Sequence, residues 1–378
     1  GGVGGGIAIA SPQLTGTLGG TPLQLRAARA EWRHAGASFA LDDVAARIGR
    51  TGSVTELDFA RLVGRVASGG ILGTFAGGSG RIGAVPLQLA DAAGDWRFAA
   101  SVLSLEGALS VSDTADSARF RPLAARTVTL RLADNVITAD GTLFEPAKNV
   151  KVAAVTIRHQ LSSGAGNARL DVPGITFGDG FQPEELTPLT FGVIADVRGS
   201  VRGVGNIDWS PDGVTSTGTF ATDQLDLAAA FGPVAGIKGQ LRFTDLLALE
   251  SAPNQTVTVA EINPGVAVTD GVIDYQLLRD LRVKVNGGVW PFASGTLTLR
   301  PTLLDFSSPQ ERHMTFLIEG MEARHFLQKF DFKNLDATGV ADGVLPMIFD
   351  QSGGRIEDGR LVMREGGGSI AYLGELTE

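Results

Sequence analysis

The sequence predicts a mainly β fold, built as one long, curved and mostly antiparallel sheet with a few short helices. Two observations carry this prediction. Glycine supplies 51 of the 378 residues, and a glycine inside a helix costs about 1 kcal/mol relative to alanine. Short runs that alternate apolar and polar residues recur along the whole chain, and a period of two is typical of strands with one buried face. Many such strands in series indicate an antiparallel sheet.

The alternating runs divide their residues between two faces of the predicted sheet. They occupy residues 23–26, 87–89, 96–98, 103–106, 128–132, 155–158, 241–244, 257–259, 283–285 and 297–300. Because successive side chains of a strand point to opposite faces, the apolar members share one face. The polar members Thr129, Arg131, Lys284, Thr298 and Arg300 are expected to face water.

The N-terminal third contains an internal repeat. Residues 21–33 match residues 85–97 at a constant offset of 64, with Pro-Leu-Gln-Leu and Trp-Arg in both copies. A repeat made of strands indicates an extended architecture, although a chance match in a chain of biased composition is the alternative. We expect β-repeats over residues 1–120, further strands over 121–221, and a C-terminal β module with short helices over 222–378.

Helical signals are few. Residues 321–330 combine good helix formers with apolar residues at helical spacing. Residues 223–231 form a second candidate, ended by Gly232 and Pro233, and residues 55–66 form a weak third. Helices this short are expected to cap or cross the sheet.

Composition and motifs argue against several classes of function. The net charge of −9 disfavours nucleic-acid binding. The absence of cysteine excludes disulfides, thiolate zinc sites and a cysteine nucleophile. No hydrolase, metalloprotease or phosphate-loop motif occurs, and the four histidines are far apart in sequence. We therefore expect no enzyme activity, no metal site and no cofactor.

Two further features bear on function. No run of about 18 apolar residues, the length that a membrane helix needs, is present, and the first residues lack a basic signal segment, so we expect a piece of a longer protein. Phenylalanine occurs 19 times and tyrosine twice. This bias favours a surface that holds a wholly apolar ligand, or equally an ordinary sandwich core.

Five segments together resemble a known family. They are residues 260–271, 289–295, 337–347, 354–361 and 367–372. In this order they resemble the C-terminal region of the YdbH family, which belongs with the AsmA-like proteins, including TamB, of Gram-negative envelopes. The resemblance is good over residues 222–378 and diffuse upstream.

The resemblance implies a fold and a function. Such proteins are anchored in the inner membrane by an N-terminal helix, which is missing from this chain, and extend through the periplasm as a long β-sheet curled into a groove (a β-taco). The groove carries phospholipid acyl chains between the inner and outer membranes, and a small outer-membrane lipoprotein is the partner at the C-terminal end. An older family label, dicarboxylate transport, lacks physical support because the chain has no membrane-spanning segment to form a path.

We expect the apolar positions of the alternating runs, with one later run, to line this groove. They are Val128, Leu130, Leu132, Val155, Ile157, Leu241, Phe243, Val257, Val259, Val283, Val285, Leu297, Leu299, Phe316 and Ile318. The C-terminal strand near Ile370 and Tyr372 is expected to be a pairing edge.

Two other classes of function stay open. A β-solenoid passenger or adhesin would show repeats of about 20 to 30 residues. A carbohydrate-active β enzyme would need two carboxylates about 5 to 10 Å apart in a cleft.

Overall fold

In a computed structural model, the structure describes residues 5–18, 20–49, 54–83, 85–229, 232–263, 267–308, 310–329, 332, 334–350 and 353–374. Contacts divide the chain into two compact units. Unit 1 comprises Gly1–Ile175, Glu184–Leu189 and Val204–Ser216, and unit 2 comprises Thr176–Pro183, Thr190–Gly203 and Thr217–Glu378. The division into residues 1–120, 121–221 and 222–378 stays a prediction.

Strands dominate the described residues. They are β1 (Gly6–Ala10), β2 (Gln13–Leu18), β3 (Thr21–Arg26), β4 (Arg29–Arg33), β5 (Ser38–Ile48), β6 (Thr55–Ala67), β7 (Gly70–Arg81), β8 (Leu87–Ala99), β9 (Val102–Asp113), β10 (Leu123–Ala133), β11 (Val136–Glu145), β12 (Val150–Gln160), β13 (Ala165–Phe177), β14 (Ile194–Ser210), β15 (Gly213–Ala229), β16 (Gly232–Asp245), β17 (Glu250–Ser251), β18 (Gln255–Ile262), β19 (Val268–Leu278), β20 (Arg282–Phe292), β21 (Gly295–Leu299), β22 (Thr302–Asp305), β23 (Arg312–Glu322), β24 (Leu335–Ala337), β25 (Val340–Asp350), β26 (Gly353–Ile356), β27 (Arg360–Met363) and β28 (Ile370–Tyr372). The helical segments of the described residues are α1 (Ala323–Lys329) and the 3-10 turns η1 (Pro183–Glu185) and η2 (Pro188–Thr190).

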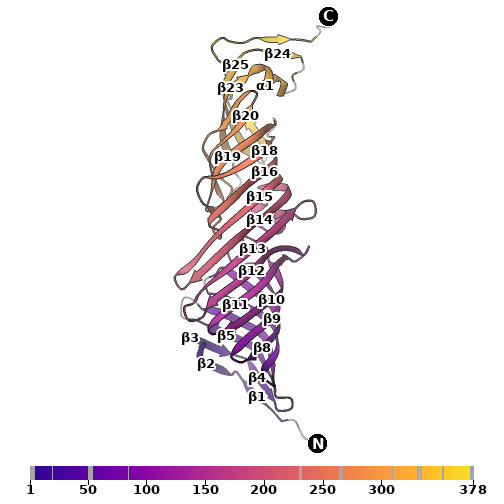
Figure 1. Cartoon of the computed structure of the whole chain (residues 1–378), viewed down its shortest axis with the longest axis vertical. Helices are drawn as coiled ribbons and strands as arrows, with labels where there is room; N and C mark the ends of the chain where they lie inside the picture. The colour runs from indigo at the N-terminus through magenta and orange to yellow at the C-terminus, as the bar shows by residue number, and fades with distance from the viewer. Residues whose placement is uncertain are drawn as a thin grey trace. The chain divides into compact units, whose positions relative to one another are not determined.

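Twenty-six of these strands belong to one antiparallel sheet, and β24 and β28 form a second, two-stranded sheet. The predicted mainly β, antiparallel fold with few short helices is therefore confirmed. In unit 1, β1 pairs with β4 and β2 with β3, β5 pairs with both β3 and β4, and β6 to β13 follow as neighbours in chain order (Figure 1). From β5 to β13 each strand pairs with the next, so short connections suffice there.

In unit 2, several long strands pair on one side with two shorter strands in place of one. β16 pairs with β15, β17 and β18, and β18 with β19. β20 pairs with β19 on one side and with β21 and β22 on the other. β23 then pairs with β21 and β25, and β25 with both β26 and β27.

Bulges bend the strands of both units. Several strands contain an interior residue with positive φ, namely Asp43 (50°), Gly77 (61°) and Asp91 (53°) in unit 1, and Gly236 (66°), Asp270 (58°) and Gly320 (68°) in unit 2. The pairing register shifts at several of these positions, for example between Phe75 and Gly78 and between Ala90 and Ala93. A bulge bends its strand and increases the local twist, so a row of bulges curves a sheet.

Glycine is required at two of these bulges. A Cβ on Gly77 would lie 2.7 Å from the Cβ of Ala60, and one on Gly236 would lie 2.5 Å from the Cβ of Ala260. At Gly236 the bulged backbone N–H also donates to Asp226 Oδ1 at 2.7 Å. The same device, a left-handed glycine packed on an alanine of the neighbouring strand, thus occurs in each unit.

The internal repeat corresponds to a step of four strands. The first copy, residues 21–33, forms β3 and β4, and the second, residues 85–97, contains most of β8. The next strands keep the same offset, since β5 begins at Ser38 and β9 at Val102. In the first copy β3 and β4 both pair with β5, just as the single strand β8 pairs with β9 in the second. The repeat therefore reflects one strand position that is broken in the first copy and continuous in the second.

Two of the three predicted helices are wrong. Residues 55–66 lie in β6, and residues 223–229 lie in β15, while Phe231 of the second candidate falls outside the described residues. In both segments, backbone hydrogen bonds to neighbouring strands outweigh the local preference for a helix. The third candidate is confirmed as α1, which begins two residues later than the predicted start because Met321 and Glu322 end β23; Phe330 lies outside the described residues.

Candidate functional site

Unit 1 presents one apolar face and one polar face across β9 to β13. Directly paired residues of neighbouring strands point to the same side of a sheet. One row of pairs runs through Leu105, Leu130, Ala139, Ile157 and Ala168. The adjacent row, which points to the other side, runs through Ser104, Arg131, Thr138, Arg158 and Asn167. Across the five consecutive strands β9 to β13, apolar side chains therefore lie on one face of the sheet and polar side chains on the other.

The large apolar side chains of this face are only half-buried. Val128, Leu130, Leu132, Val155 and Ile157 are all in this intermediate class, while the buried positions nearby are mostly alanines. Thr129 and Arg131 are exposed, as their places in the alternating run predict. A filled core would bury its large side chains completely, so this apolar face is not fully covered by the described residues.

Unit 2 contains an apolar cavity of about 730 Å³. Three rows of paired residues form much of its wall. The lining members are Trp290, Leu297, Ile318 and Leu361 in the first row, Leu299, Phe316 and Leu345 in the second, and Met314, Met347 and Ile356 in the third. Gly343 belongs to the first row and Gly288 to the second, and neither lines the cavity. Antiparallel register brings these side chains together on one face of β20, β21, β23, β25, β26 and β27.

The lining of this cavity is almost wholly hydrocarbon. Ile262, Val268, Ile273, Val285, Phe292, Leu304, Phe326 and Phe349 complete it, and Gly359 is the one lining residue without a side chain. None of the described residues that line the cavity carries a charge or a titratable group. The cavity lies within the size range of ligand sites, and it can hold an apolar ligand but offers no acid, base or metal ligand.

The indole of Trp290 is packed over glycines of its own and the neighbouring strand. A Cβ on Gly271 of β19 would collide with the indole Nε1, and one on Gly288 would lie 2.5 Å from the ring. Trp290 is 3% exposed, and its Nε1 is buried without a hydrogen-bond partner among the described residues. The glycines therefore make room for a large flat wall residue.

Five of the fifteen predicted groove residues line this cavity: Val285, Leu297, Leu299, Phe316 and Ile318. Val259 and Val283 belong to the same apolar cluster as the cavity wall. Phe243 is buried elsewhere in unit 2, and Leu241 and Val257 are half-buried. The remaining five are the half-buried residues of unit 1, so the structure does not gather all fifteen in one cavity. That they line a path for lipid stays a prediction.

Several cavity residues were missed from the sequence. Trp290, Phe292, Leu345, Met347 and Phe349 lie in β20 and β25 and line the cavity. Residues 344–349 form a continuous apolar run, so alternation could not assign residues 345, 347 and 349 to one face. Strand alternation also could not identify Phe326 as a cavity residue, because Phe326 lies in the helix α1.

The chain matches a known protein family over nearly its whole length. The family model, described as YdbH-like, intermembrane phospholipid transport protein YdbH, matches residues 4–378. The chain belongs to the YdbH-like family. The resemblance is therefore confirmed, and it also covers the part upstream of residue 222. Neither a curated protein nor a solved structure matches the chain. The general function of the family is transport of phospholipid between membranes, and the family is not a known class of enzyme.

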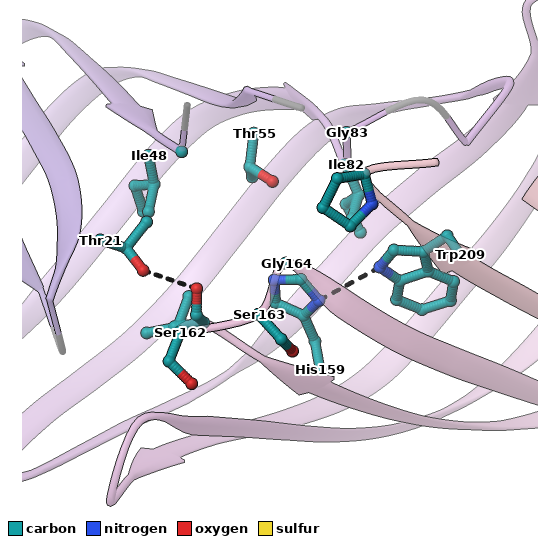
Figure 2. A pocket seen from close by; sticks show the side chains of 13 residues that line it. Thr21, Ile48, Thr55, Ile82, Gly83, His159, Ser162, Ser163, Gly164 and Trp209 are labelled. Carbon is teal, nitrogen blue, oxygen red and sulfur yellow. Dashed lines mark hydrogen bonds between the residues drawn. The ribbon is translucent and has the colours of Figure 1, made fainter. Parts of the chain in front are cut away.

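A second, smaller pocket of about 280 Å³ lies in unit 1 of the YdbH-like chain. Figure 2 shows its two hydrogen bonds: Thr21 Oγ1 donates to Leu161 O at 2.5 Å, and Trp209 Nε1 donates to His159 Nδ1 at 3.1 Å. Burial lowers the pKa of His159, which favours the neutral ring that this bond requires. These polar groups already satisfy one another, so the pocket is a weaker candidate than the cavity of unit 2.

Other features of the YdbH-like chain do not add chemistry. Among the described residues, no three histidine, aspartate or glutamate side chains gather as a metal site would require. Within the same residues, no helix has the length and apolar character needed to cross a membrane.

Proposed function

We propose that the apolar cavity of unit 2 and the apolar face of unit 1 hold phospholipid acyl chains while the headgroup stays in water. In this way the YdbH-like chain carries phospholipid through the periplasm between the inner and outer membranes. The observation that carries the proposal is a cavity of about 730 Å³ whose described lining residues are all uncharged.

Energetics favour this use of the cavity. A 16-carbon acyl chain exposed to water costs on the order of 10 kcal/mol, at about 0.8 kcal/mol per CH₂ group. A continuous apolar wall removes most of this barrier because each methylene leaves water for hydrocarbon. Polar recognition would instead need side chains that this wall lacks.

The cavity reaches the surface at its C-terminal strands. Ile356 of β26 and Leu361 of β27 line the cavity, yet they are 55% and 46% exposed. Apolar residues that lie both on a cavity wall and at the surface mark an opening through which a chain can enter or leave. The family resemblance supports a small outer-membrane lipoprotein as the partner at this end, and an inner-membrane anchor for the full-length protein.

The proposal is tested by comparing two adjacent positions of β21. Leu299 is 6% exposed and lines the cavity, whereas the half-buried Thr298 points to the opposite face. A photoreactive residue at position 299 should crosslink to phospholipid in donor vesicles, and one at position 298 should not. Equal crosslinking at both positions would overturn the assignment.

A charge at the same positions gives a functional readout. Leu299→Asp should slow phospholipid transfer between vesicles by orders of magnitude, because an acyl chain would have to pass an unpaired charge at a cost of several kcal/mol. Thr298→Asp should transfer lipid at the unmodified rate. Thermal unfolding of both variants separates loss of transfer from loss of fold, and equal transfer by two folded variants would contradict the proposal.

A further inference from the structure

The connection between β23 and β25 is unusually long for two neighbouring antiparallel strands. β23 and β25 pair directly, yet residues 323–339 separate them and contain α1 and β24. Antiparallel neighbours need only two to five connecting residues. The extra length contains α1, which follows β23 directly, and β24, which pairs with β28.

The helix α1 contributes to the wall of the apolar cavity. Phe326 lines the cavity, and its ring lies 6.3 Å from the ring of Phe292 in an edge-on arrangement. Among the described residues that line the cavity, Phe326 alone comes from a helix, and the others come from strands or from the turn at Gly359. No residue of α1 is fully buried, so the helix covers the cavity without being part of a closed core.

Two exposed polar contacts and one cation–π contact join the body of α1 to turns of the sheet, and at its start the Ala323 backbone N–H donates to Gly339 O at 3.0 Å. Ser294 Oγ lies 2.6 Å from His325 Nδ1, and Lys329 Nζ donates to Ala267 O at 3.3 Å. Lys329 also lies 5.9 Å from the ring centre of Phe292. Ser294 follows β20 and Ala267 precedes β19, so both polar contacts reach turns at one margin of the sheet.

These contacts are weak enough to break during transport. Both polar contacts are solvent-exposed, and exposed polar and ionic contacts contribute little net stability. At the far end of the connection, Gly339 has a φ of 96° and is closely packed, since a Cβ there would collide with Met363 Cε. This end of the connection is therefore held in place, and the movement belongs to α1 itself. Segments with few buried contacts open at low free-energy cost.

We propose that α1 is a lid on the apolar cavity, latched at Ser294 and Ala267, which must swing away from Phe292 for an acyl chain to pass sideways through the margin of the sheet. This inference rests on the proposed function. It adds a lateral route, controlled by α1, to the opening at β26 and β27.

The absence of cysteine from the chain allows a direct test. The double variant Ser294→Cys/His325→Cys in the full 378-residue chain can be closed by oxidation or by a short bis-maleimide bridge, which tolerates a wider spacing of the two residues. The matched control is Thr256→Cys/Asp274→Cys, an exposed pair on neighbouring strands β18 and β19 whose side chains are 2.7 Å apart. The control bridge joins two strands of the sheet and leaves α1 free.

Phospholipid transfer between vesicles is measured before and after bridging. Bridging the lid pair should slow transfer by about tenfold or more, and reduction of the disulfide should restore it, whereas bridging the control pair should change nothing. Unchanged transfer with the lid bridged would overturn the lid and leave the proposed function intact. Absence of transfer by the unbridged chain would remove both.

A second readout does not depend on lipid. A cysteine placed at Leu299, which lines the cavity, should react with a soluble maleimide faster in Phe326→Ala than in the parent, because the truncated lid residue leaves the wall open. A cysteine at Thr298 should react at the same rate in both. Equal rates at position 299 would also overturn the lid.

Discussion

At the scale of single residues, Asp113 organises the connection between β9 and β10. Its carboxylate accepts hydrogen bonds from the backbone N–H groups of Ala115 and Arg119 and from the Arg119 guanidinium, with the ion pair at 2.6 Å. Burial opposes ionisation of Asp113, but these hydrogen bonds outweigh it and lower the pKa to about 2. A shielded carboxylate with several donors is therefore a structural anchor.

We predict that this anchor makes stability depend on acid. The pKa of an unfolded aspartate is about 3.9, so the contribution of Asp113 is fully present above pH 4 and is lost as the pH falls toward 2. Asp113→Asn should lower the free energy of unfolding by about 2 kcal/mol at neutral pH, and the difference from the parent should shrink below pH 4. Urea unfolding at several pH values measures this.

The control for this prediction is Asp116→Asn. Asp116 is an exposed residue of the same connection, and its replacement should change stability by less than about 0.5 kcal/mol. An Asp113→Asn variant as stable as Asp116→Asn at neutral pH would contradict the role given to Asp113.

At the scale of strands, the bulges bend individual strands within each unit. Gly236 combines a left-handed φ of 66° with close approach to Ala260. Gly236→Ala should therefore lower stability by about 1 to 3 kcal/mol, since both backbone strain and overpacking oppose the added methyl group. The midpoint of urea unfolding measures the loss.

Gly16→Ala is the matched control. Gly16 lies within β2, lacks a positive φ, and a Cβ there would meet nothing within 4 Å. Its replacement should be neutral or stabilising by up to about 1 kcal/mol. If both substitutions had the same effect, the bulge at Gly236 would not be a constraint on the fold.

The sequence predicted strands more reliably than helices for a physical reason. Alternation identified the half-buried positions of β10, such as Leu130 beside the exposed Arg131, because each residue's face follows from period two. The segment 223–229 was mistaken for a helix because its alanines and leucines have high helix propensity, and only the pairing with β16 decides otherwise. Long-range pairing is not visible in a local pattern.

Long-range pairing also limits how much of the cavity can be predicted from the sequence. Leu299 and Phe316 were recognised as apolar-face residues, but their meeting across β21 and β23 is a matter of register. Phe326 was predicted to lie in a helix, yet its place in the cavity depends on how a long connection returns over the sheet. The residues of the wall could thus be predicted individually, whereas the cavity itself could not.

At the scale of the whole molecule, charge and hydrocarbon act on different parts of a phospholipid. The chain carries a net charge of −9, while the described residues that line the cavity of unit 2 are uncharged. Acyl chains are common to phospholipids of every headgroup, so the wall should not distinguish among them. The net charge acts on the headgroup at longer range and is screened by salt.

We therefore predict a headgroup preference that disappears with salt. At low ionic strength, phosphatidylglycerol, which is anionic, should be transferred more slowly than zwitterionic phosphatidylethanolamine with the same acyl chains, because the approach of an anionic vesicle is repelled. Above about 0.15 M salt the Debye length falls to about 8 Å, and the two rates should converge. Vesicle transfer assays with matched acyl chains over a salt series measure this ratio. A preference that persists at high salt would require a headgroup site with its own polar side chains, and it would contradict binding by the acyl chains alone.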